Sequence, residues 1–131
     1  MADRIGFDAS ELSYVATALS RAAAVAPAEA AKVVTKGALN IKTGARRRVS
    51  GLAHAPAYPR SIDFDQVRVT TRGAQTEVGP NKDKRQGALG NILEFGTIKN
   101  APIPHIAPEA DLEQPRFEKA MEDLAVKALG L

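Results

Sequence analysis

Residues 91–97 read Asn-Ile-Leu-Glu-Phe-Gly-Thr, and a proline-rich stretch, Ala-Pro-Ile-Pro-His-Ile-Ala-Pro, follows at 101–108. These two stretches decide how the chain leaves one helical segment and enters the last one. Glu94 is the single carboxylate in the first stretch, and it lies between two apolar residues just before Gly96. Its position allows three roles: a catalytic acid, a buried ion-pair partner, or an ordinary polar residue on a short helix.

A carboxylate in this setting is costly to bury unless it is paired or accepts hydrogen bonds from the backbone. The basic residues of segment 30–62 offer charged partners, either within the chain or in a neighbouring subunit. We therefore expect Glu94 to be a structural acceptor that fixes the turn at Gly96–Thr97, and not a catalytic group.

The residues around this stretch predict a short helix, an extended arm and a final helix. Ala88–Phe95 has room for two helical turns, and Gly96 is suited to end them. Pro102, Pro104 and Pro108 predict an extended, rigid segment over 98–108. The last helix is expected to begin near Asp111, with Pro115 still in its first turn. Its apolar stripe comprises Phe117, Met121, Leu124, Ala128 and Leu131.

The N-terminal part predicts two helices. The first begins at Asp8, which with Glu11 forms a capping box, and it ends before Pro27, the expected first residue of the second helix. The second helix fades near Gly44 or continues to Val49. Its apolar face comprises Ala30, Val33, Val34, Gly37 and Ile41, and Arg46, Arg47 and Arg48 fall at its C-terminal end, where positive charge is favourable.

The middle of the chain predicts a small antiparallel sheet. Apolar and polar residues alternate over 62–71, with a change of phase between Phe64 and Val67 that indicates a bulge, a turn or a change of face. Gly73 is suited to a tight turn at 71–74, and the strand returns through Thr76 and Val78. The expected fold class is therefore α+β: two N-terminal helices, a small antiparallel sheet with a β-hairpin, a short helix and a C-terminal helix.

The composition predicts a single domain with a thin core. The chain has 131 residues, of which 24 are alanine and only six are aromatic. Alanine contributes little apolar area, so burial against copies of the same chain is an attractive way to gain stability. The chain has no cysteine, and the sequence contains neither a signal peptide nor an apolar run long enough to span a membrane. We expect it to be made in the cytoplasm.

Charge is unevenly distributed along the chain. Segment 30–62 has seven basic residues and no acidic one, whereas 1–29 and 109–131 are net acidic. Such a basic block suits either nucleic acid or a complementary face on a neighbouring subunit. The candidate interface or DNA-facing residues are Lys42, Arg46, Arg47 and Arg48.

Catalytic and ligand sites are not indicated. His54 and His105 have no neighbouring ligand at metal spacing, and Asp63 with Asp65 is better explained as a solvated strand face. Gly87 and Gly90 do not form a dinucleotide fingerprint. We therefore predict no catalytic residues, no cofactor, no metal and no enzymatic activity.

The order of these motifs resembles the tail-completion, or head–tail joining, family of long-tailed double-stranded DNA bacteriophages. The similarity rests on Val78-Gly79-Pro80, on Glu94-Phe95-Gly96-Thr97 and on the segment from Pro102 to Pro108, and it covers approximately residues 28–128. Members of the family often have a Pro-x-x-Thr-Gly-x-Leu step after the second helix. Here Thr43-Gly44 is followed by Ala45 and the arginines, and the leucine is missing.

The resemblance implies a non-enzymatic structural protein of the virion, located in the neck. Such a subunit forms a homo-oligomeric ring, expected to be a hexamer, between the head-side connector and the tail terminator or tail tube. The genome passes through the ring, so nonspecific contact with DNA is compatible with this role. The alternative is a small basic DNA-binding accessory protein, which would bind DNA as a free chain with a steep dependence on salt.

Overall fold

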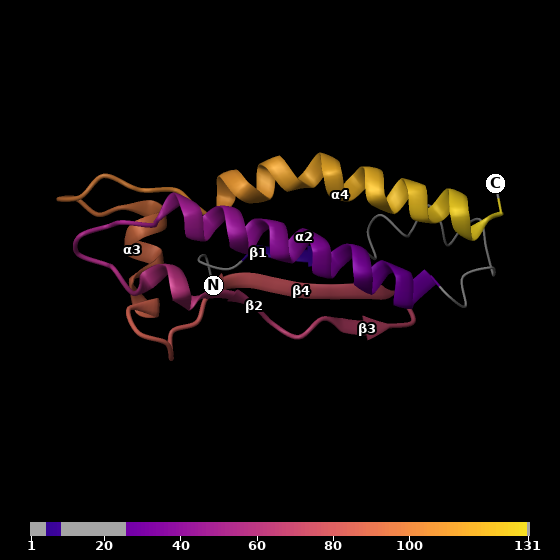
Figure 1. Cartoon of the computed structure of the whole chain (residues 1–131), viewed down its shortest axis with the longest axis horizontal. Helices are drawn as coiled ribbons and strands as arrows, with labels where there is room; N and C mark the ends of the chain where they lie inside the picture. Colours follow the sequence, from indigo (N-terminus) through magenta and orange to yellow (C-terminus); the bar gives the residue numbers. More distant parts are fainter. Residues whose placement is uncertain (1–4, 9–25, 131) are drawn as a thin grey trace.

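A small sheet and two long helices form successive layers (Figure 1). The computed structural model describes residues 5–8 and 26–130. The long helix α2 (Ala26–Arg48) packs on the sheet, and α4 (Ala107–Ala128) packs along α2. The fold is therefore α+β, as the sequence predicts.

Helix α2 runs without a break through Gly44, so the longer of the two predicted ends is correct. Its apolar positions keep the helical period past Gly44: Ala45 and Val49 are fully buried, in line with Ile41 and Ala38. Glu29 lies in the first turn and the three arginines in the last, so the charges at both ends favour the helix dipole.

The sheet is built around one long strand, β4 (Gly73–Pro80). β1 (Ile5–Asp8) pairs antiparallel with one edge of β4, placing Ile5 opposite Val78. β2 (Ile62–Phe64) and β3 (Arg68–Thr70) pair antiparallel with the other edge.

The gap between β2 and β3 coincides with the predicted change of phase. Asp65 in this gap still donates its backbone N–H to the Glu77 carbonyl at 3.0 Å, and the Thr76 hydroxyl donates to the Asp65 carbonyl at 2.6 Å. The predicted turn also forms, because the chain reverses at 71–72 and Gly73 has a φ of 142°. β2 and β3 therefore form one interrupted edge strand that pairs along β4.

A short helix follows the sheet at the end of the molecule where α2 ends (Figure 1). A 3-10 turn at Gly87–Leu89 leads into α3 (Gly90–Phe95), and Gly96 ends the helix with its N–H donated to the Ile92 carbonyl at 2.9 Å. Both α3 and its end at Gly96 agree with the sequence prediction.

The prediction for the start of the last helix is wrong. α4 begins at Ala107, four residues before Asp111, so Pro108 belongs to its first turn and not to the extended arm. Pro115 lies inside the helix. Proline is tolerated at the start of a helix because its missing N–H would have no intrahelical partner there. The sequence prediction treated Pro108 as the end of the arm and thus placed the start too late.

Two apolar clusters hold the layers together. The larger lies between the C-terminal part of α2, the sheet and the start of α4, and includes Ile41, Tyr58, Ile62, Val78 and Ile106. The smaller lies between the N-terminal part of α2 and α4, and includes Val34, Phe117 and Met121. The predicted stripe of α4 is thus confirmed at Phe117 and Met121.

Two of the sequence predictions lie outside the described residues. The predicted first helix falls almost entirely within residues 9–25, and Leu131 of the predicted α4 stripe is the last residue of the chain. β1 was not predicted from the sequence, because four residues without a clear alternation become a strand only through pairing with β4.

Candidate functional site

The carboxylate of Glu94 lies where the proline-rich segment joins α4. The residue is only 5% exposed. Its Oε1 accepts the backbone N–H of His105 at 3.1 Å and of Ile106 at 2.9 Å, and its Oε2 accepts that of Ala107 at 3.3 Å. The first N–H groups of a helix have no intrahelical acceptor, so Glu94 supplies one from outside the helix.

The structure agrees with the predicted acceptor role of Glu94 but not with the predicted location of the groups that it binds. It is a buried structural acceptor, but it fixes the start of α4, not the turn at Gly96–Thr97. None of the basic residues of segment 30–62 is its partner in the described structure. Backbone N–H groups and His105 take that role.

A second buried contact joins Glu94 to Tyr58 through His105. The Nδ1 atom of His105 lies 2.7 Å from the Ile103 carbonyl and 3.2 Å from Glu94 Oε1, and both are acceptors. Nδ1 must therefore carry a proton. On the other side of the ring, Nε2 lies 2.7 Å from the Tyr58 hydroxyl. In the neutral ring, Nε2 is unprotonated and accepts the Tyr58 proton.

Tyr58 and His105 are both fully buried, so solvent and substrates do not reach this chain of contacts. Gly90 is part of the same packing, since a Cβ at this position would lie 2.5 Å from Pro80 and 3.3 Å from the Tyr58 hydroxyl. The arrangement is suited to holding the proline segment and α4 in register with the rest of the fold.

A tight turn projects from this anchored base. Thr97 and Asn100 exchange backbone hydrogen bonds at 2.9 and 3.3 Å, which leaves Ile98 and Lys99 at the apex. Gly96 has φ 75°, and a Cβ there would lie 2.7 Å from the Pro102 nitrogen, so glycine is required on both counts. The returning limb is held by the Ile103 N–H, which donates to the Leu93 carbonyl at 2.7 Å.

The projecting turn and the adjacent face of α3 expose large apolar side chains. Ile98 is 106% exposed, Phe95 55% and Ile92 46%. We call these three residues the apolar tip. Figure 1 shows the segment extending beyond the end of α2 and away from the layered body. Three large apolar side chains exposed within seven consecutive residues are typical of a docking surface.

The prolines of the signature occupy different places. Pro102 and Pro104 lie on the limb that returns from the apex, in extended backbone. Each lacks an N–H, so neither competes for the acceptors used by Ile103 and His105. Pro108 lies in the first turn of α4, as described above.

The basic candidates are mostly occupied within the chain. The Arg46 guanidinium donates to the carbonyls of Ile62 at 2.9 Å and Arg60 at 3.3 Å, and Arg48 pairs with Glu109 at 2.6 Å. Arg47 is exposed and forms no side-chain hydrogen bond or ion pair in the described part of the chain. Of the four candidates, Arg47 is thus the one whose charge has no partner within residues 5–8 and 26–130.

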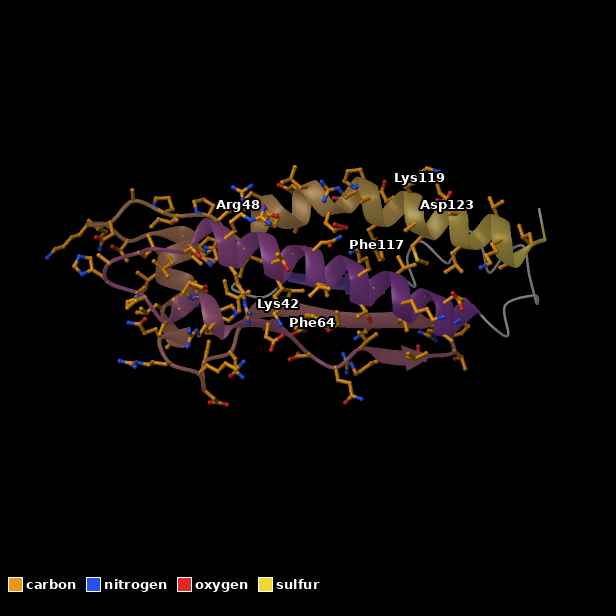
Figure 2. The ribbon with its side chains drawn as sticks, viewed as in Figure 1. Lys42, Arg48, Phe64, Phe117, Lys119 and Asp123 are labelled. Atoms are coloured by element: carbon orange, nitrogen blue, oxygen red, sulfur yellow. The ribbon has the colours of Figure 1, made fainter. Side chains whose placement is uncertain are left out.

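Lys42, the fourth candidate, extends from α2 toward β2 (Figure 2). Its Nζ pairs with Asp63 at 3.0 Å and lies 5.6 Å from the centre of the Phe64 ring, while Lys84 approaches the same carboxylate at 3.6 Å. Burial acts to raise the pKa of Asp63. The hydrogen bonds from Lys42 and the Phe64 N–H, together with the two lysine charges, outweigh it and hold that pKa below its ordinary value.

An open groove runs between α2 and α4. It has a volume of about 500 Å³ and apolar walls that include Val33, Phe117 and Leu124. At its margin the buried carboxylate of Glu113 accepts both hydrogen bonds of Asn40, at 2.8 and 3.2 Å. Glu113 was not singled out from the sequence. Its position four residues before Phe117, in line with the predicted apolar stripe, is the one sequence signal that could have identified it.

Within residues 5–8 and 26–130, no group of three or more His, Asp or Glu side chains is placed to hold a metal ion. None of the helices described there is long and apolar enough to cross a membrane.

The sequence reasoning identified Glu94 but missed its connection to Tyr58, because the two residues are far apart in the chain. His105 has a local contact with the Ile103 carbonyl and also bridges Tyr58 and Glu94, and the sequence carries no signal for that bridge. Comparisons with protein-family models, with curated proteins and with solved structures gave no match to this chain.

Proposed function

We propose that this chain is a structural, non-enzymatic subunit of the bacteriophage neck, which forms a ring between the head-side connector and the tail and surrounds the path of the genome. The observation that carries the proposal is the apolar tip, which is exposed at one end of the molecule on a base fixed by Glu94. A docking element that is rigid as well as exposed binds more tightly, because ordering a flexible loop on binding costs affinity.

The contacts at the base of the tip support this reading. Three backbone N–H groups bind Glu94, and glycine at position 96 allows the chain to turn back closely on itself. The residues that resemble the neck-family signature, Glu94 to Thr97 and Pro102 to Pro108, thus lie in and around this projecting segment. A neighbouring neck protein is its proposed partner.

The basic residues favour this function over that of a DNA-binding accessory protein. Lys42, Arg46 and Arg48 are engaged by Asp63, by backbone carbonyls and by Glu109. A phosphate-binding surface needs basic groups that are available to phosphates. Contact with the passing genome in the assembled ring would then be nonspecific.

The test uses a phage that carries this gene with an amber stop codon. In a non-suppressing host we expect DNA-filled heads and finished tails that remain separate, counted by electron microscopy. The variant Phe95→Ser/Ile98→Ser should give the same defect with a normally folded chain. Val69→Ser is the matched control, since Val69 is 50% exposed on β3, and it should join heads to tails normally.

Normal particles in the absence of the protein would exclude the proposal. Binding of the purified chain to DNA at physiological salt, with affinity that falls steeply as salt rises, would favour the accessory-protein alternative. Turnover of a substrate by the purified chain would contradict its non-enzymatic part.

A further inference from the structure

Helix α2 presents an exposed basic face. Lys36, Leu39, Thr43 and Arg47 recur at spacings of three or four residues and are all exposed, with Leu39 at 44%. They therefore lie on one side of the helix. Lys36 and Arg47 form no side-chain hydrogen bond or ion pair within the described residues. We call these four residues the α2 face.

Helix α4 presents an acidic face of the same length, on which Asp111, Pro115 and Glu122 are exposed and Glu118 is half-buried. Asp111, Pro115, Glu118 and Glu122 recur at spacings of four, three and four residues, and Leu112, 51% exposed, lies beside them. Asp111 and Glu122 form no ion pair in the part of the chain that the structure describes. We call these five residues the α4 face.

The two faces match in both charge and dimension. Lys36 and Arg47 are separated by eleven positions, as are Asp111 and Glu122. At 1.5 Å per residue, both pairs span about 16 Å along their helices. Each face has a half-exposed leucine between or beside its charges, so apolar contact and charge pairing can form together.

The faces cannot satisfy each other within one chain. α2 and α4 already contact each other where Arg48 pairs with Glu109 and Asn40 binds Glu113. These contacts turn Leu39 and Leu112 outward. Lys36 lies on the α2 wall of the groove between the two helices, but no residue of the α4 face lines that groove. An acidic helical surface of the right length is present on every copy of the chain, which identifies a second copy as the occupant.

We propose that the α2 face of one copy binds the α4 face of the next. This inference rests on the proposed ring and names its lateral contact. Because the two faces differ, the contact is heterologous, and repeating it generates a closed ring or an open helical array. The apolar tip remains available for other neck proteins, since it lies on neither face.

The chain contains no cysteine, so cross-linking can test the contact directly. A chain carrying both Leu39→Cys and Leu112→Cys, treated with a short bismaleimide, should yield a ladder of covalent oligomers. Each single variant alone should not form a ladder, and an equimolar mixture of the two should stop at dimers. The matched control combines Leu39→Cys with Val69→Cys, which places the second thiol on an exposed β3 position, and should not form a ladder.

Charge reversal supplies an independent readout. Lys36→Glu/Arg47→Glu in the double-cysteine chain should abolish the ladder, and adding Asp111→Lys/Glu122→Lys to the same chain should restore it. Arg68→Glu/Arg85→Glu, at two exposed positions outside both faces, should leave the ladder unchanged. Circular dichroism of all variants should match the parent, because every substituted side chain is exposed.

The cross-linking is carried out on purified protein and on phage particles. A ladder no stronger than that of the Leu39/Val69 control in both preparations would overturn the contact, as would failure of the second charge reversal to restore it. A ladder in purified protein from a gene that particles do not require would support the contact and reject the neck role. Particles that require the protein but give no ladder would support the neck role and overturn the lateral contact.

Discussion

At the scale of single residues, Glu94 shows how a carboxylate can be both buried and structural. Its two oxygens accept the N–H of Ala107 at the start of α4 and those of His105 and Ile106 just before it, and Oε1 also contacts the imidazole of His105. A hydrogen bond to a charged group contributes more than one between neutral groups. One side chain therefore fixes the end of α3, the returning limb and the start of α4.

We predict that Glu94→Ala lowers the free energy of unfolding by about 2–3 kcal/mol, because three backbone N–H groups lose their acceptor. Glu94→Gln keeps one carbonyl oxygen and should lose about half as much. Urea denaturation measures both values. Glu122→Ala on the exposed side of α4 is the control and should change stability little, and equal losses at positions 94 and 122 would contradict the assignment.

At the scale of elements, charged contacts join α2 to its neighbours on both sides. Asp63 on β2 receives Lys42 from α2, and Glu109 on α4 receives Arg48 from the last turn of α2. The basic residues in the C-terminal half of α2 thus help to hold the sheet and α4 against α2. The sequence located the basic cluster, but packing determined that most of it is used internally.

We predict a pH-dependent contribution from Asp63. Its pKa in the folded chain is lower than the ordinary value of 3.8, so the stabilisation is complete above that value and disappears as the pH falls through the lowered pKa. Asp63→Asn keeps the acceptor for the Phe64 N–H but removes the charge. Because the Asp63 side chain is 39% exposed, solvent screening limits the loss at pH 7 to about 0.5 kcal/mol.

Urea denaturation of Asp63→Asn and the parent chain at pH 7 and in acid measures this effect. The difference in unfolding free energy should shrink toward zero in acid. Glu122→Gln should show no such trend, and a difference at Asp63 that stays constant with pH would rule out the charge as its source.

At the scale of the whole molecule, apolar side chains are divided between a thin core and exposed surfaces. Within the described part of the chain, alanine and valine make up eight of the fourteen buried apolar residues of the core, and Tyr58, Ile41 and Ile62 are the largest fully buried ones. Large apolar residues such as Phe95 and Ile98 are placed outside it. A chain with few large apolar residues that leaves several of them exposed is suited to gaining stability from partners.

The same substitution at two isoleucines tests this division. Ile41→Ala should lower the free energy of unfolding by about 2–4 kcal/mol, since Ile41 is fully buried between α2 and the sheet. Ile98→Ala should leave the stability of the isolated chain unchanged. Thermal and urea denaturation measure both, and a comparable loss at Ile98 would mean that the turn packs against the body of the molecule.

Local signals explain why much of the fold could be predicted. The period of Val34, Ile41 and Val49 predicts α2, and Gly96 marks the end of α3. The interrupted edge strand follows from the change of phase between Phe64 and Val67. These features depend on residues close together in the chain, so their physics is local.

The remaining features depend on residues that meet only after folding. β1 exists through pairing with β4, and α4 starts at Ala107, whose N–H is accepted by Glu94, thirteen positions earlier. The sequence alone does not reveal this acceptor, so it predicts that the extended segment continues to Pro108.

Periodicity, helix ends and the cost of burying charge act locally, so the amino-acid sequence is sufficient to predict the α+β class, the long basic helix and the glycine-ended short helix, and to favour a structural role for Glu94. Packing between distant residues establishes that Glu94 binds three N–H groups and His105, that Lys42, Arg46 and Arg48 have partners within the chain, and that Phe95 and Ile98 are exposed. Each of these outcomes depends on which distant groups packing brings within hydrogen-bond distance and which it leaves exposed.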